Sequence, residues 1–277
     1  MDSLMGDVEA DRALKEKHKA LWSLGNYPAV AEQVIPVTGP RLVAALQIDR
    51  GQRVLDVGAG SGNAAIPAAR MGADVVASDL APALLDAGRS HAIEQGVALE
   101  WREADAEALP FGDGEFDVVM SCVGVMFAPH HQASADELVR VCRPGGSIGL
   151  LSWTPEGFIG QMFATMKPYA PPPPPGAQPP PLWGDEEHVR RLLGDRVTDV
   201  VAVKEILTVD RFSSAEDMRE FFKATYGPTI AVYRNIQDDP DSVDTLDREL
   251  VDLAGRYFDK GTATMGWEYL LFTATRR

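Results

Sequence analysis

The segment VLDVGAGSGNAA, residues 54–65, restricts the fold of this chain more than any other, because glycines occupy alternate positions 58, 60 and 62. A short apolar run precedes the glycines and an alanine-rich stretch follows them, so the segment predicts a strand, a tight turn and a helix. Without Cβ atoms the turn allows a ligand to approach the backbone closely, and the helix N-terminus offers free N–H groups. In α/β proteins, nucleotide-like ligands bind at such turns.

Short apolar runs alternate with amphipathic stretches through the middle of the chain. This alternation indicates a doubly wound α/β fold, in which a mainly parallel sheet has helices on both faces. The expected strands cover residues 53–58, 74–79, 99–105, 116–123, 146–153, 199–212 and 267–277.

The outer parts of the chain follow a different pattern. Residues 1–45 look helical and would form a lid segment before a domain that covers 46–277. Nine of the 20 prolines lie between Pro168 and Pro181, so residues 168–183 are expected to form an extended surface connector, or less plausibly a ligand for a proline-recognition domain. A helical insertion is expected at about 213–262.

The net charge of −15 argues against a nucleic-acid partner and against binding to anionic membranes. The first residues carry acids where a signal peptide would be basic and then apolar, and no uncharged apolar run approaches the ~20 residues of a membrane span. A cytoplasmic protein is therefore expected. The two cysteines, Cys122 and Cys142, are expected to fill core space.

Two further acids sharpen the ligand prediction. Asp79 ends the second predicted strand, where a carboxylate can accept both ribose hydroxyl hydrogens, and Asp105 follows the third, where it can accept from an adenine amino group. The loop itself reads D-x-G-x-G-x-G from Asp56, and Asn63 stands where a dinucleotide fold would have its third glycine.

With these motifs the chain resembles the class I S-adenosylmethionine-dependent methyltransferases, and most closely the ubiquinone/menaquinone-type group that acts on small molecules. The resemblance rests on VLDVGAGSGNAA, VVASDLAPALLDAGR, READAEALPFGDGEFDVVMSCVGVMFAPHH and ADELVRVCRPGGSIGLLSW, between residues 53 and 153. It implies a seven-stranded sheet whose last strand is antiparallel, and S-adenosylmethionine as cofactor. It does not specify the substrate.

The resemblance also implies roles for single residues. Gly58, Ala59, Gly60 and Gly62 would pass close to the methionine and ribose portions of the cofactor, and Asp56 would orient the loop and a bound water. The ribose and adenine would be held by Asp79, Leu80, Asp105 and the amide of Ala106, and the backbone of Ser121 would accept from the methionine ammonium.

Methyl transfer from a sulfonium requires alignment of the nucleophile, and a hydroxyl nucleophile usually needs a general base as well. His130 and His131 follow the fourth predicted strand and are candidates for that base, although a solvent-facing pair at a helix entry is an equally valid interpretation. The sequence contains neither HExxH nor CxxC, so no metal is expected. Aromatic and Met residues around the sheet edge favour an apolar or aromatic small-molecule acceptor, with Tyr27, Met126 and Tyr226 as candidate contacts.

Two other functions stay open at this point. An NAD-dependent oxidoreductase of the short-chain type would have wider glycine spacing and a Tyr-x-x-x-Lys pair, and none of the six tyrosines has lysine four residues later. A non-catalytic S-adenosylmethionine-binding protein would show an eroded glycine loop, whereas this loop is intact. The sequence does not decide the oligomeric state.

Overall fold

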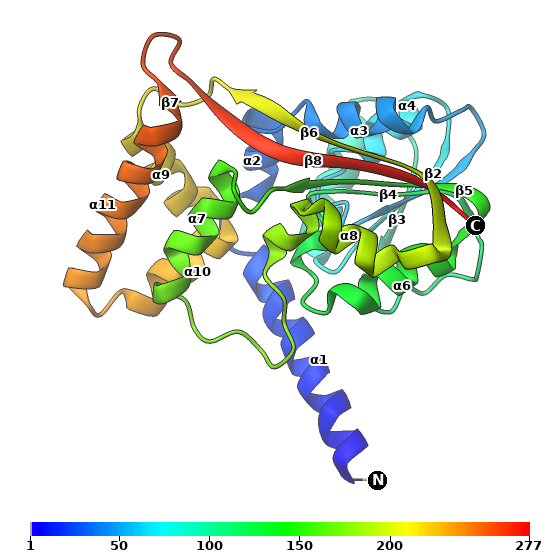
Figure 1. Cartoon of the computed structure of the whole chain (residues 1–277), viewed down its shortest axis with the longest axis horizontal. Coiled ribbons are helices and arrows are strands. Elements are labelled where there is room, and N and C mark those ends of the chain that lie inside the picture. The colour runs from blue at the N-terminus through cyan, green and yellow to red at the C-terminus, as the bar shows by residue number, and fades with distance from the viewer. Residues whose placement is uncertain (1) are drawn as a thin grey trace.

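An eight-stranded sheet runs through the protein in the order β3-β2-β1-β4-β5-β8-β6, and the short β7 pairs with β8 (Figure 1). This computed structural model describes residues 2–277, with side chains from residue 12 onward. The strands are β1 (Arg53–Val57), β2 (Asp74–Asp79), β3 (Glu100–Glu103), β4 (Phe116–Cys122), β5 (Cys142–Trp153), β6 (Val197–Val209), β7 (Phe258–Asp259) and β8 (Thr264–Arg276).

Strands β1 to β5 are parallel, and β8 is antiparallel to both of its neighbours, β5 and β6. The central strand β1 pairs with β2 and β4, so that Asp56 lies opposite Ala77 on one side and Met120 on the other. Residues 54–57 are all buried, as a strand covered on both faces requires. The predicted mainly parallel sheet with an antiparallel last strand is confirmed.

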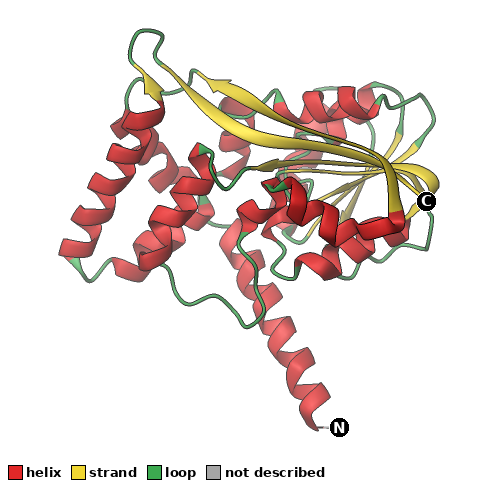
Figure 2. Ribbon diagram, in the orientation of Figure 1, coloured by secondary structure: helices red, strands yellow, loops and turns green. Residues whose placement is uncertain are grey.

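Helices cover both faces of the sheet: α3 and α4 lie on one face, and α6 and α8 on the other (Figures 1 and 2). Helices α7, α9, α10 and α11 form a cap at the end of the sheet (Figure 1). Helix α1 extends away from the body at its N-terminal end. The bounds are α1 (Asp2–Trp22), α2 (Tyr27–Gln33), α3 (Thr38–Leu46), α4 (Ala65–Arg70), α5 (Pro82–Glu94), α6 (His131–Val141), α7 (Phe158–Met166), α8 (Glu186–Leu193), α9 (Ala215–Thr225), α10 (Gly227–Ile236) and α11 (Pro240–Tyr257).

Of the predicted strands, only that at 74–79 has the same two ends in the structure, and the strands expected at 199–212 and 267–277 form at Val197–Val209 and Thr264–Arg276. Two of the differences have a local cause. β3 stops at Glu103, because Asp105 turns back to form an isolated bridge with Ala108. β5 starts at Cys142, which pairs with Phe116 ahead of a bulge, so the segment RPGG belongs to the strand and does not precede it. Both differences lie where a local turn sits beside a strand end, and apolar patterning carries little information there.

The proline-rich connector has no helix or strand between residues 170 and 179. Short 3₁₀ turns flank it at Lys167–Tyr169 and Pro180–Gly184. The Gln178 N–H donates to the Pro129 carbonyl at 3.0 Å, which fastens the connector beside the turn that follows β4. A stiff proline segment is suited to join the two 3₁₀ turns, because it loses little conformational entropy on folding.

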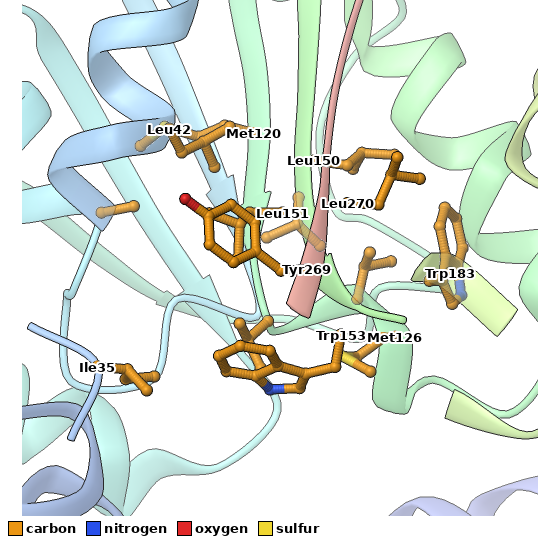
Figure 3. Packing of buried hydrophobic residues seen from close by; sticks show 14 of the residues in the cluster. Ile35, Leu42, Met120, Met126, Leu150, Leu151, Trp153, Trp183, Tyr269 and Leu270 are labelled. Carbon is orange, nitrogen blue, oxygen red and sulfur yellow. The ribbon is translucent and has the colours of Figure 1, made fainter. Parts of the chain in front are cut away.

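The core lies between the sheet and its helices, where Trp153, Met126 and Leu151 gather at the end of β5 (Figure 3). Cys142 is buried, Cys122 is partly buried, and both are free thiols. Within residues 2–277, no helix combines the length and apolar character that crossing a bilayer requires.

Candidate cofactor and substrate site

A cavity lies at the carboxyl ends of β1, β2 and β4, next to the last turns of α1. The hollow measures about 660 Å³ when the solvent in its open mouth is included. The residues of the predicted site that lie on its wall are Tyr27, Gly58, Gly60, Asp79, Leu80, Asp105 and Ala106. Those predicted residues that lie elsewhere are Asp56, Ala59, Gly62, Ser121, Met126, His130, His131 and Tyr226.

The glycine loop needs its glycines for two different reasons. Gly58 has a φ of +67°, and a Cβ there would meet Gly124 Cα at 2.8 Å, so the loops after β1 and β4 can approach only without side chains. Gly60, with a φ of +54°, exposes its bare Cα toward the Tyr27 ring, 3.5 Å from the position of a Cβ. The loop thus leaves backbone free to face a ligand on the cavity wall.

Asp79 fastens this loop to the end of β2. Its Oδ2 accepts the Gly60 N–H at 2.8 Å and its Oδ1 accepts the Ala81 N–H at 2.8 Å. Burial raises the pKa of Asp79, and the N–H groups oppose that rise by favouring the charged form. Each carboxylate oxygen keeps acceptor capacity, so Asp79 can also receive hydroxyl hydrogens from a ligand in the cavity.

Asp56 lies beneath the loop and not on the cavity wall. It is 1% exposed, and neither carboxyl oxygen has a hydrogen-bond partner among the residues that the structure describes. Burial raises the pKa of Asp56 to about 8. A buried carboxyl group without a partner is costly, and it fits the predicted role of holding a water under the ligand.

The turn after β4 is held by Ser121, whose hydroxyl donates to the Val57 carbonyl at 2.6 Å and accepts the Val125 N–H at 2.8 Å. The Ser121 side chain is 1% exposed, lies off the cavity wall and makes both bonds within the protein. Only its backbone could meet a ligand, as the resemblance implies.

Asp105 lies on the wall beside a lysine that the sequence analysis did not single out. Lys15 Nζ is 3.2 Å from both Asp105 carboxyl oxygens and also pairs with Glu107. Lys15 is 8% exposed, and Glu107 also accepts the His130 N–H at 2.7 Å. These contacts hold the segment after β3, for which the resemblance predicts adenine binding, and they fasten α1 across it.

Helix α1 contributes Lys15, His18 and Trp22 to the cavity wall. They share one face of the helix because they are spaced by three and four residues. Lys15 and His18 were not predicted. The sequence did hold a signal for this contact: two lysines one helical turn apart, Lys15 and Lys19, could pair with the alternating acids of residues 103–107. In the structure, Lys19 Nζ lies 2.5 Å from Glu103. Sequence alone did not say that these segments meet.

Aromatic rings continue the cavity toward the cap helices. Trp22 is at the centre: its ring centroid lies 5.4 Å from that of Tyr27, 4.6 Å from Phe127 and 6.1 Å from Tyr226. Phe163 lies 6.0 Å from Phe127. We call these five residues the aromatic cluster; three of them, Trp22, Tyr27 and Phe127, line the cavity itself.

The other two predicted substrate contacts are placed differently. Tyr226 is 5% exposed and lies behind Trp22 and Tyr27, within the aromatic cluster. Met126 is fully buried in the core near Trp153 (Figure 3), so its side chain is not available to a ligand in the cavity. The 3₁₀ turn Val125–Phe127 directs Met126 inward and Phe127 to the wall.

Neither predicted histidine lies on the cavity wall. His130 Nδ1 is 3.0 Å from Glu107 Oε2, and its Nε2 faces the proline-rich connector at Gly176. His131 is fully buried on the far side of the turn, where its Nδ1 lies 2.9 Å from His188 Nε2. Burial lowers the pKa of His131 to about 4. His131 is therefore not in position to take a proton from a substrate in the cavity.

The cavity suits an adenosyl ligand with a cationic end. Carboxyl groups stand on the wall at Asp79 and Asp105, and the buried carboxyl group of Asp56 lies beneath it, whereas the surface near the cap is aromatic and uncharged. Among residues 12–277, no group of three or more His, Cys, Asp and Glu is placed to hold a metal ion.

Comparisons with known proteins agree with this geometry. Residues 55–150 match a family described as a methyltransferase domain. An uncharacterized protein of Mycobacterium tuberculosis (strain ATCC 25618 / H37Rv) is 52% identical over 267 residues, which cover 96% of this chain and 97% of that protein.

A ubiquinone/menaquinone biosynthesis C-methyltransferase of Zymomonas mobilis is 35% identical over 183 residues, 66% of this chain and 69% of its own length. Among solved structures, a putative methyltransferase of Bacillus halodurans superposes with a TM-score of 0.55 at 19% identity, covering 86% of this chain and 97% of that one. At that identity the likeness concerns the fold alone.

Proposed function

The chain belongs to the class I S-adenosylmethionine-dependent methyltransferases, and on that premise we propose that it transfers a methyl group from S-adenosylmethionine to a small apolar or aromatic molecule. The observation that carries the proposal is the junction of two surfaces in one cavity. The glycine loop with Asp79 and Asp105 forms one surface, and the three members of the aromatic cluster that line the cavity form the other.

The residues present fit the cofactor. Asp79 and Leu80 would hold the ribose and one adenine face, and Asp105 and Ala106 would meet the adenine edge. The bare backbone at Gly58 and Gly60 would lie against the methionine and ribose portions. When bound, S-adenosylmethionine supplies an activated methyl group on a sulfonium.

The protein's part in the reaction is alignment and exclusion of water. Trp22, Tyr27 and Phe127 line the cavity, with the Trp22 ring packed edge to face against the other two. Together they give an apolar or aromatic acceptor a surface to lie against. Alignment of a bound nucleophile can lower a barrier by ~7–11 kcal/mol in favourable cases. The last turns of α1, fastened by Lys15, cover the cavity on the side of β3.

The proposal also covers the class of acceptor, the cellular location and the N-terminal segment. The acceptor is a small molecule and not a nucleic acid, since the net charge is −15. We propose a cytoplasmic enzyme. The N-terminal segment 1–45 would act as a lid over the domain of residues 46–277.

Calorimetry and labelled methyl transfer test this proposal. We expect micromolar binding of S-adenosylhomocysteine, no binding of NAD, and transfer of label from [methyl-³H]S-adenosylmethionine to at least one member of a panel of phenols, quinols and heterocyclic amines. Binding of S-adenosylhomocysteine without transfer to any acceptor would favour a non-catalytic binding protein. Binding of NAD alone would refute the assignment and favour an oxidoreductase.

A further inference from the structure

The cavity wall carries few side chains that can take a proton. Of its titratable residues, Asp79 and Asp105 are carboxylates already used within the protein: Asp79 accepts two backbone N–H groups, and both oxygens of Asp105 lie 3.2 Å from Lys15 Nζ. Lys15 is an ammonium donor already paired with Asp105 and Glu107. Tyr27 keeps its proton, because burial raises the pKa of its phenol. Among the side chains that the structure describes, those of residues 12–277, one titratable group on the wall is left, His18.

We infer that the His18 imidazole is the general base that takes the proton of the methyl acceptor, an inference that rests on the proposed function. His130 and His131, which the sequence suggested for this role, lie off the cavity wall, whereas His18 lies on it.

The place of His18 on α1 fits a base that acts between cofactor and acceptor. Lys15, one turn before it, reaches Asp105 at the predicted adenine end, and Trp22, one turn after it, stands in the aromatic cluster. Side chains three and four residues apart on a helix share one face, so His18 lies between these two ends of the cavity.

The surroundings of His18 keep it ready to accept a proton. Burial lowers the pKa of His18, and the Lys15 cation on the same helix lowers it further; His130 acts in the same direction. Glu107 and Asp105, which face it from the segment after β3, oppose this shift. The net direction is downward, so the ring is neutral at neutral pH and has a free nitrogen lone pair.

The step balances as a single displacement with proton loss. The O–H or N–H bond of the acceptor breaks, and its proton passes to the free ring nitrogen of His18. The electron pair left on the acceptor forms the bond to the methyl carbon, while the carbon–sulfur bond breaks and leaves its pair on sulfur. The resulting imidazolium returns its proton to solvent.

The first measurement needs no acceptor. In protein labelled with ¹³C-histidine, we expect the His18 ring signal, assigned by its loss in His18→Gln, to shift when S-adenosylhomocysteine binds. We also expect it to titrate below the ordinary value of 6.5 for a histidine side chain. His91, half-buried on α5 and away from the cavity wall, is the internal reference whose signal S-adenosylhomocysteine should leave unchanged. A His18 signal that S-adenosylhomocysteine leaves unchanged would overturn the inference.

The second measurement compares two phenols at about pH 8. The hydroxyl of 4-methylphenol titrates near pH 10, as tyrosine does, and needs a base, whereas 4-nitrophenol is largely ionised already. We expect His18→Gln to slow methylation of 4-methylphenol about 100-fold and that of 4-nitrophenol less than about threefold, with S-adenosylhomocysteine affinity retained. His91→Gln is the matched control and should slow neither.

The outcomes separate the inference from the proposed function. Equal slowing of both phenols in His18→Gln would mean that the ring only packs α1 against the cavity, and the base assignment would be wrong. Failure of the wild-type protein to bind S-adenosylhomocysteine would instead refute the proposed function.

Discussion

The buried histidine pair makes a quantitative prediction about stability in acid. His131 is fully buried, its Nδ1 lies 2.9 Å from His188 Nε2, and its pKa is lowered to about 4, first by burial and then by His188. In the unfolded chain the same ring titrates near pH 6.5. We therefore expect the free energy of unfolding to change when the pH falls from 6.5 to 4.

The sign follows from proton binding. Between pH 6.5 and 4 the unfolded chain binds a proton at His131 that the folded protein does not, so stability falls as pH falls. Above pH 6.5 the ring is neutral in both states, and the free energy of unfolding is not reduced by protonation of His131. The 2.5-unit difference corresponds to a loss of about 3 kcal/mol by pH 4, of which about 2 kcal/mol is lost by pH 5.

The assay is urea unfolding followed by tryptophan fluorescence at about pH 7.5, 6 and 5, in wild type and in His131→Gln. Glutamine can still donate to His188 and does not titrate, so the variant should lose about 2 kcal/mol less than wild type over this range. Because His188 and His18 also have lowered pKa values, only the difference between the two proteins isolates His131. Parallel pH curves for the two proteins would refute the reasoning.

Three further predictions concern the cavity. Asp79→Ala should weaken S-adenosylhomocysteine binding by about 1–3 kcal/mol in calorimetry and also lower Tm, since two backbone N–H groups lose their acceptor; unchanged affinity would contradict the ribose assignment. Lys15→Met should speed amide hydrogen exchange in residues 15–22, corresponding to about 1–3 kcal/mol of weaker α1 docking, and the double variant with Glu107→Gln should restore part of the protection. Exchange at the wild-type rate in the single variant would show that the Lys15–Glu107 pair does not hold the helix. Gly58→Ala should destabilise the protein by at least about 1 kcal/mol more than Gly96→Ala in urea unfolding, because both have nearly the same positive φ but only Gly58 faces a neighbour within 4 Å; equal losses would mean that backbone strain alone matters.

The sequence predicted those parts of the protein whose signals are local. The glycine loop, the acid at the end of β2 and the succession of strands along the chain through β5 follow from short segments. The sheet is mainly parallel with an antiparallel last strand, as expected. Gly58, Asp79 and Asp105 lie on one cavity because parallel strands end at the same edge of a sheet.

The sequence could not place side chains whose direction depends on distant packing. Whether His130 or His131 faces the cavity depends on His188 and Trp183, which pack against His131 from more than 50 residues away in the chain. Likewise, Lys15 and His18 belong to the site only because α1 docks on the segment after β3. Met126 shows the same limit, since one 3₁₀ turn reverses the directions of neighbouring residues.

The order β5-β8-β6 has a consequence for how the chain is made. β6 joins the sheet only through β8, and β8 is synthesised after β6 and after all the cap helices from α9 to α11. During translation the ribosome therefore releases β6 without a partner, with Val201, Val203 and Ile206 exposed even in the finished fold. Until β8 inserts between β5 and β6, that nascent chain has an unpaired strand and exposed apolar side chains, which are features that favour aggregation.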